Sequence, residues 1–179
     1  EPQKTLGDAY NLACLYARGQ YLCLLKPGQV LLPGSIQTMI EALEKYKSLG
    51  VVFGQGSTQP VSRSHFEGEV LTSAKDLLLR GIIPSLPWMI RKHYFVQTQG
   101  FESGQNFFAE YDILLKLEEV CEMFVLNSNL LKSDFAKFPD LLATNILPVV
   151  NSALLRRSLS LKCGVRGERL YFYQNGELD

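Results

Sequence analysis

Three cationic side chains stand where predicted strands end, a position from which they could bind phosphate. Lys26 directly follows the apolar run Tyr21–Leu25. Arg91 and Lys92 follow an extended segment, Ile82–Ile90. A lysine ammonium can hold a phosphate group as a point charge, and an arginine can do so with two parallel hydrogen bonds. The alternative is that these side chains are simply solvated at strand ends, and the sequence leaves both interpretations open.

Few other side chains could take part in chemistry. Trp88 could stack on a sugar ring, although a lone tryptophan beside Met89 also fits a buried core. The two histidines, His65 and His93, lie near no cysteine in the sequence. The four cysteines are far apart, are flanked by apolar residues and form no C-x-x-C pair. This spacing argues against a zinc site and predicts buried, reduced thiols, so we expect no metal and no cofactor.

The composition is that of a globular protein and excludes several classes of function. Eighteen Lys and Arg residues balance eighteen Asp and Glu residues in a chain of 179, so the formal net charge is zero. A neutral chain gives no electrostatic reason to expect nucleic acid or an anionic membrane as a partner. No apolar run approaches the roughly 18 to 20 residues that cross a bilayer, and the first residues lack signal-peptide character. We expect a cytoplasmic protein without a transmembrane segment.

Strands and helices alternate through most of the chain, which predicts an α/β domain of three layers, with a sheet between helices. The residue patterns predict helices at 6–18, 33–50, 73–80, 107–120 and 135–159, the last with a break near Pro148. They predict strands or extended segments at 21–25, 51–54, 82–90, 123–126 and 170–173. Gly19 is placed to end the first helix as its C′ residue, and Asn175–Gly176 favours a hairpin turn. We expect residues 1–179 to form one domain that ends in a helical extension, 128–179.

Two stretches contain motifs that occur together in one enzyme family. Residues 7–25 are similar to G-x-x-x-x-N-x-G-x-x-x-A-x-G-E-Y-I-x-x-L-D, with matches at Asn11, Ala17, Gly19, Tyr21 and Leu25. Residues 77–101 resemble an extended segment that ends in Arg-Arg before a helix and G-G-F-D, with Arg91, Lys92, Gly100 and Phe101 in those places. These motifs belong to the inverting family 2 glycosyltransferases, which have a GT-A fold.

A third motif extends the resemblance. Residues 109–117, A-E-Y-D-I-L-L-K-L, resemble the family helix E-D-Y-D-L-L-L-R-L. The family-like core therefore covers about residues 7–127. In the family the aspartate of E-D is the general base of the transfer. The resemblance implies Glu110 as that base, while Asp112 is expected to cap the helix or to pair with a neighbour.

The resemblance also implies what this chain lacks. The family's metal-binding segment D-x-D-D corresponds to Lys26, Pro27, Gly28 and Gln29, which offer no carboxylate. The nucleotide-binding first half of the family is absent from the chain, so the predicted fold is a partial GT-A-like mixed sheet. Without carboxylates Mg²⁺ or Mn²⁺ would have no ligands here, and Lys26 could supply the positive charge instead.

Three hypotheses remain open from the sequence. The domain could bind a nucleotide-sugar or a glycan and transfer sugar without a metal, with Lys26, Trp88, Arg91 and Lys92 in contact with substrate. It could be a non-catalytic relic that acts in assembly, in which case the apolar strand edge at Tyr21–Leu25 predicts a homodimer or a partner subunit that covers it. It could also be a piece of a longer protein whose missing half lies upstream.

Overall fold

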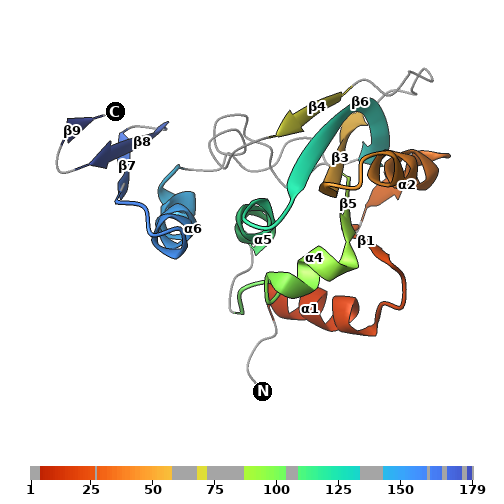
Figure 1. Ribbon diagram of the computed structural model, residues 1–179, viewed down its shortest axis with the longest axis horizontal. Coiled ribbons are helices and arrows are strands. Elements are labelled where there is room, and N and C mark those ends of the chain that lie inside the picture. The colour runs from red at the N-terminus through yellow and green to blue at the C-terminus, as the bar shows by residue number, and fades with distance from the viewer. Residues whose placement is uncertain are drawn as a thin grey trace. The chain divides into compact units, whose positions relative to one another are not determined.

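The chain forms two compact units, Glu1–Ala136 and Lys137–Asp179 (Figure 1). The computed structural model describes residues 5–26, 28–57, 68–71, 87–103, 109–133, 143–160, 162–166, 169–174 and 177–178. The predicted helix 73–80, most of the predicted segment 82–90 and His65 lie outside these residues. None of the helices that are described is long and apolar enough to cross a membrane.

The first unit is a mixed α/β structure built on a six-stranded sheet. The strand order is β1-β5-β3-β6-β2, and β4 also pairs with β6. Among the strands that the structure describes, β3 and β6 are parallel neighbours and the other neighbours are antiparallel. The strands are β1 (Tyr21–Cys23), β2 (Gln29–Leu31), β3 (Leu49–Ser57), β4 (Gly68–Leu71), β5 (Trp88–Arg91) and β6 (Glu122–Ser133). The sheet therefore has the mixed strand directions that the α/β interpretation expected.

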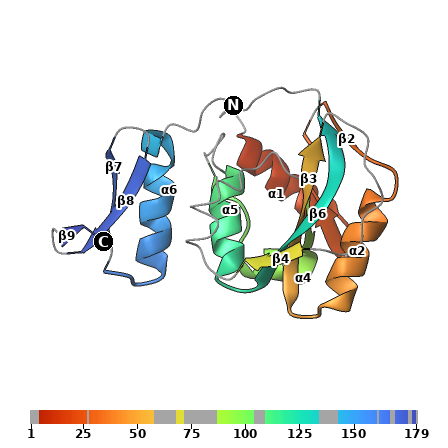
Figure 2. The ribbon, with the colours of Figure 1, turned by 90° about the horizontal axis from the view of Figure 1, so that it is seen from above.

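Helices cover both faces of this sheet, as the two views in Figures 1 and 2 show. One helix, α2 (Ser35–Lys45), packs Met39 and Leu43 against Val52 and Met89 of the sheet. The opposite face is covered by α5 (Ala109–Glu118), next to α1 (Leu6–Tyr16) and α4 (Lys92–Gln97). Burying an apolar side chain removes its surface from water, which stabilises the folded chain by about 1.5–3 kcal/mol for each large side chain. The three-layer prediction is confirmed.

At the ends of α1 and α2, the predicted start of α2 is confirmed, whereas both predicted helix ends are wrong. Gly34 caps α2 with a left-handed φ of 86°, a conformation that glycine adopts at little cost. That helix ends at Lys45, however, before the predicted Gly50. The first helix ends at Tyr16 with an extended cap residue, Ala17, so the prediction that Gly19 is its C′ residue is wrong.

The central strands are longer than the apolar runs that predicted them. The run 51–54 grows into a strand of 9 residues and the run 123–126 into one of 12, because β6 pairs with β3 and also with β4 and β2. A close approach explains why β3 contains Gly54: a Cβ added there would lie 2.4 Å from Cδ1 of Leu130. Pairing partners that are remote in sequence thus decide how far these strands extend.

The second unit corrects the expectation of a helical extension. It contains α6 (Ala143–Arg156), which continues through Pro148 instead of breaking there. Three strands follow and form an antiparallel sheet: β7 (Lys162–Arg166), β8 (Arg169–Gln174) and β9 (Glu177–Leu178). The register pairs Gln174 with Glu177, which is the hairpin that the sequence predicted at this point. The strand before the hairpin, at 162–166, was missed.

Candidate functional site

A tight turn occupies the segment that the family resemblance aligns with metal-binding carboxylates. It follows β1, and the backbone N–H of Gln29 donates to the carbonyl of Lys26 at 3.1 Å. The Gln29 side chain closes the turn from outside, because its Oε1 accepts from the Lys26 backbone N–H at 2.8 Å. Gly28 has a φ of 80°, in the left-handed region that a side chain disfavours. Lys26, Gly28 and Gln29 therefore belong to a hydrogen-bonded turn that has a lysine, and not an aspartate, at its start.

The structure brings Lys26 and Glu110 together. The Nζ atom of Lys26 lies 2.7 Å from Oε2 of Glu110, and the hydroxyl of Tyr10 donates to Oε1 at 2.9 Å. Only 4% of the Glu110 side chain is exposed, compared with 25% of the Lys26 side chain. We call Tyr10, Lys26 and Glu110 the Glu110 cluster. Its members come from α1, from the turn after β1 and from α5, so the tertiary fold creates it.

Burial and the two neighbouring side chains shift the pKa of the Glu110 carboxyl in opposite directions. Burial is the largest effect and raises the pKa of Glu110 above its ordinary value of 4.5. The charge and hydrogen bond of Lys26, together with the hydrogen bond from Tyr10, lower that pKa and offset part of the effect. The pKa of Tyr10 is raised, first by burial and then by the neighbouring Glu110 charge, which keeps the phenol protonated as a hydrogen-bond donor.

A second buried carboxylate lies on the same helix. Asp112 is 2% exposed and pairs with Lys116 one turn later, with 2.9 Å between Oδ2 and Nζ. Lys116 also contacts Glu102 at 3.2 Å. The expectation that Asp112 pairs with a neighbour is met by this geometry. Both buried carboxylates of α5 thus have a lysine as counterion.

The two cations at the end of β5 bind the protein's own backbone. Arg91 donates to the carbonyl of Leu49 at 3.0 Å and to that of Leu43, and its Nη1 lies 3.2 Å from Glu44. Lys92 donates to the carbonyl of Ala17, just after α1. These contacts satisfy the carbonyl groups of Ala17 just after α1, of Leu43 in the last turn of α2 and of Leu49 at the start of β3. These are structural contacts, and Lys92 also lines the pocket described below, so the phosphate contact that the sequence left open for Arg91 and Lys92 stays a prediction.

Trp88 is a core residue. It is 2% exposed, and its indole stacks on Phe53 of the neighbouring strand with 6.3 Å between ring centroids. Because the Trp88 ring is buried, a sugar ring cannot stack on it in this structure. The sequence left core packing open as the alternative for Trp88, and the geometry fits that alternative. His93, by contrast, is exposed and packs against Tyr94.

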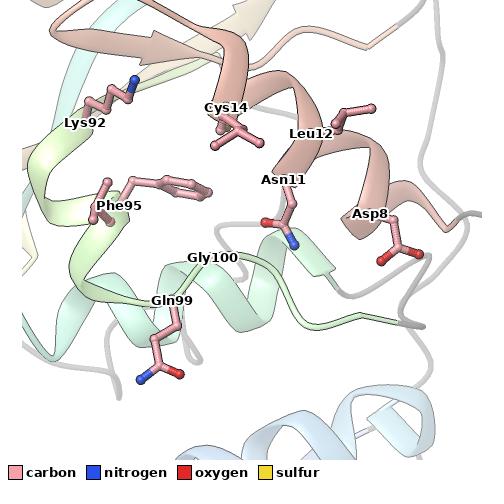
Figure 3. A pocket seen from close by; sticks show the side chains of 10 residues that line it. Asp8, Asn11, Leu12, Cys14, Lys92, Phe95, Gln99 and Gly100 are labelled. Atoms are coloured by element: carbon pink, nitrogen blue, oxygen red, sulfur yellow. The ribbon is translucent and has the colours of Figure 1, made fainter.

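A pocket of about 630 Å³ lies between α1 and α4 (Figure 3). Asn11 stands at its edge and fixes the loop after α4, because its amide exchanges two hydrogen bonds with the backbone of Phe101, at 2.8 and 2.9 Å. Exposed apolar side chains line much of the remainder: Leu12, Leu15 and Val96. The Glu110 cluster does not line this pocket. Asn11 was matched in the sequence as part of a motif, but nothing in the sequence indicated a pocket here.

The residues at the turn do not fit a divalent metal. Mg²⁺ and Mn²⁺ need several oxygen ligands, usually carboxylates, whereas Lys26 presents an ammonium to this region. Over the described part of the chain, no group of three or more His, Cys, Asp or Glu side chains could hold a metal ion. The positive charge of the Glu110 cluster comes from the Lys26 ammonium, 2.7 Å from Glu110.

Sequence comparisons identify no family for this chain. No protein-family model matches it, and no curated protein does. The fold does have a solved counterpart, "Crystal Structure of a Mycobacterial Protein", with a TM-score of 0.57 and 12% sequence identity. The match covers 97% of this chain and 62% of the other, so this chain spans less than two thirds of that protein's length. At this identity the match establishes a shared fold only.

Proposed function

We propose that the chain is a glycosyltransferase-like domain that binds a sugar nucleotide without a divalent metal. One observation carries this proposal: Lys26 places an ammonium 2.7 Å from Glu110, at the turn that corresponds to the family's metal-binding segment. A metal in such an enzyme neutralises the diphosphate that leaves, and a lysine can contribute the same sign of charge. The order of the family-like motifs along residues 7–127 supports the choice of ligand.

Transfer places a stricter demand on the site than binding does. In an inverting transfer the acceptor hydroxyl gives its proton to a base, its oxygen bonds to the sugar's anomeric carbon, and the bond to the diphosphate breaks. Glu110 is the proposed base, but both of its oxygens are engaged, by Lys26 and by Tyr10. Glu110 could act only after Lys26 had moved toward the diphosphate, and a buried carboxylate that has lost its counterion favours the protonated form, which is not a base. We therefore assign binding as the principal function and expect transfer to be slow.

The test is calorimetric titration of the intact chain with UDP-glucose and with GDP-mannose, in Mn²⁺ and in EDTA. We expect weak binding that is the same in both conditions, because the positive charge comes from Lys26. Lys26→Met should weaken it about tenfold, which corresponds to the loss of one charged hydrogen bond. Lys116→Met is the matched control, since it breaks the other buried pair of α5 and leaves Lys26 in place. No binding at millimolar ligand, or binding that requires Mn²⁺, would refute the proposal.

A second candidate function, assembly without catalysis, is favoured by the position of β1. Among the strands that the structure describes, β1 pairs with β5 alone and so stands at the end of the strand order. We propose that a second copy or a partner subunit covers this edge at Tyr21–Leu25. Light scattering at about 100 µM tests the homodimer, a concentration at which a specific interface of ordinary size is populated. A monomer under these conditions would contradict it.

We also propose a cytoplasmic location. Its support is that all four cysteines are free thiols, two of them buried, as expected in a reducing compartment. Burial raises the pKa of each of these thiols, so their reactivity is low and a structural role suits them. If this is correct, alkylation after the cells are quenched with acid and the protein is unfolded would label the thiols as reduced, whereas thiols found oxidised would count against it.

A further inference from the structure

We propose that an anion that binds Lys26 causes Glu110 to take up a proton, so that binding at this turn is coupled to protonation. The inference rests on the proposed function, since it takes the diphosphate of a sugar nucleotide as the anion. It adds a second event to that function, inside the protein, at a residue of α5 and not of the turn that holds Lys26. In the Glu110 cluster, a phosphate of the ligand would then replace the Glu110 carboxylate as the anion that pairs with Lys26.

The geometry of the cluster makes Lys26 the member that can move. It is a lysine on a flexible four-carbon stem, and 25% of its side chain is exposed. Glu110 is fixed on α5 with 4% of its side chain exposed, so an incoming phosphate can reach the ammonium more easily than the carboxylate. The turn itself is held by backbone and by Gln29, and the side chain can reorient without breaking those hydrogen bonds.

The side chains around Glu110 provide no clear substitute for the positive charge of Lys26 among the described residues. From α1 the facing group is Tyr10, a neutral phenol that donates one hydrogen bond. On α5 itself the nearest lysine, Lys116, forms its own pair with Asp112. Of the ion pairs found over the described residues, the one with Lys26 is the pair that reaches Glu110. When the ammonium turns to a phosphate, the buried carboxylate loses its counterion.

A buried carboxylate without a counterion is much less stable than a neutral carboxyl group. Burial already raises the pKa of Glu110, and Lys26 is the principal influence that lowers it. Withdrawal of Lys26 therefore raises this pKa further. By linkage, affinity for the anion increases as pH falls and decreases as pH rises, by at most about tenfold per pH unit when one proton is coupled.

Proton uptake is measured by titrating the intact chain with UDP-glucose in several buffers that differ in ionisation enthalpy, all at neutral pH. The diphosphate of this probe is fully ionised there, so protons taken from the buffer go to the protein. We expect an uptake that approaches one proton per molecule bound. Glu110→Gln should abolish the uptake while binding persists. Tyr10→Phe and Lys116→Met should retain the uptake, and circular dichroism verifies that each variant is folded.

The outcomes separate the two proposals. Binding with no proton uptake in the unmodified chain would overturn this inference and leave the proposed function intact. Equal uptake in the chain and in Glu110→Gln would overturn it as well, because the proton would then go elsewhere. No binding of UDP-glucose, GDP-mannose or pyrophosphate would overturn both proposals together. Uptake that is lost only in Glu110→Gln and Lys26→Met supports the coupling.

Discussion

Replacing Lys26 by methionine should destabilise the first unit, because it removes the counterion of a buried carboxylate. Glu110 is 3% exposed, and the Lys26 ammonium lies 2.7 Å from it. Breaking a fully buried pair from one side costs about 3–5 kcal/mol. Since 25% of the Lys26 side chain is exposed and the carboxyl can protonate, we expect a smaller loss, about 2 kcal/mol at neutral pH.

The pH dependence of this loss identifies its cause. Burial raises the pKa of Glu110 above 4.5 in the folded protein, and without Lys26 the pKa is higher still. A group whose pKa is raised on folding favours the folded state fully below its unfolded pKa, and this contribution is lost as pH rises through the folded pKa. The destabilisation by Lys26→Met should therefore be small near pH 4.5 and should grow toward alkaline pH. Urea unfolding followed by circular dichroism, in a series of buffers across this window, measures it.

Two further variants make the prediction refutable. Lys26→Met combined with Glu110→Gln removes both charges and should recover most of the lost stability, to within about 1 kcal/mol of the unmodified chain. Lys47→Met is the control, because 72% of that lysine's side chain is exposed and its loss should change stability by less than about 0.5 kcal/mol. If Lys26→Met costs no more than Lys47→Met, or costs the same at every pH, the ion pair does not have the role assigned to it.

Three other outcomes are expected. Asn11→Ala should lose about 1–3 kcal/mol in urea unfolding, because both of its hydrogen bonds to the Phe101 backbone disappear; an unchanged midpoint would contradict this. Trp88→Ala should lose about 3–5 kcal/mol, as expected for a large buried side chain, and is followed by circular dichroism because Trp88 is the single tryptophan. The pKa of Glu44 is lowered to about 2, chiefly by the hydrogen bond from Lys47. The contribution of ionised Glu44 to folding stability is therefore complete above pH 4.5 and is lost as pH falls toward 2. Glu44→Gln should flatten the pH dependence of folding stability in that interval.

The sequence predicted the elements that are marked by local signals. Helix α2 was found because Gly34 and the spacing of Met39 and Leu43 are features of a capped, one-sided helix. The extent of β6 was not predicted, since its 12 residues are held by three other strands that no local pattern reveals. The C-terminal strand β7 was missed for the same reason: it pairs with β8 across its full length.

Two of the three members of the candidate site were proposed from the sequence, but their arrangement was not. Lys26 and Glu110 were each proposed for a role, yet they are 84 positions apart, and nothing in the sequence indicated that the two form an ion pair. Tyr10 was not proposed at all, because a tyrosine in a broad apolar helix pattern reads as core. Arg91 was assigned to substrate, whereas the carbonyls that it binds become available only once β3 and α2 are placed beside it.

The turn that begins at Lys26 and closes at Gln29 limits which single substitutions it can accept. A single change of Lys26 to aspartate would remove the cation and set a second negative charge beside Glu110, so its first effect would be destabilising. Gly28, with a φ of 80°, is equally unsuited to receive a side chain while the turn persists. Mutations at these positions are therefore epistatic, and a carboxylate site could arise here only after Glu110 had changed or the turn had opened. A carboxylate could therefore enter this turn without loss of stability only together with a second change.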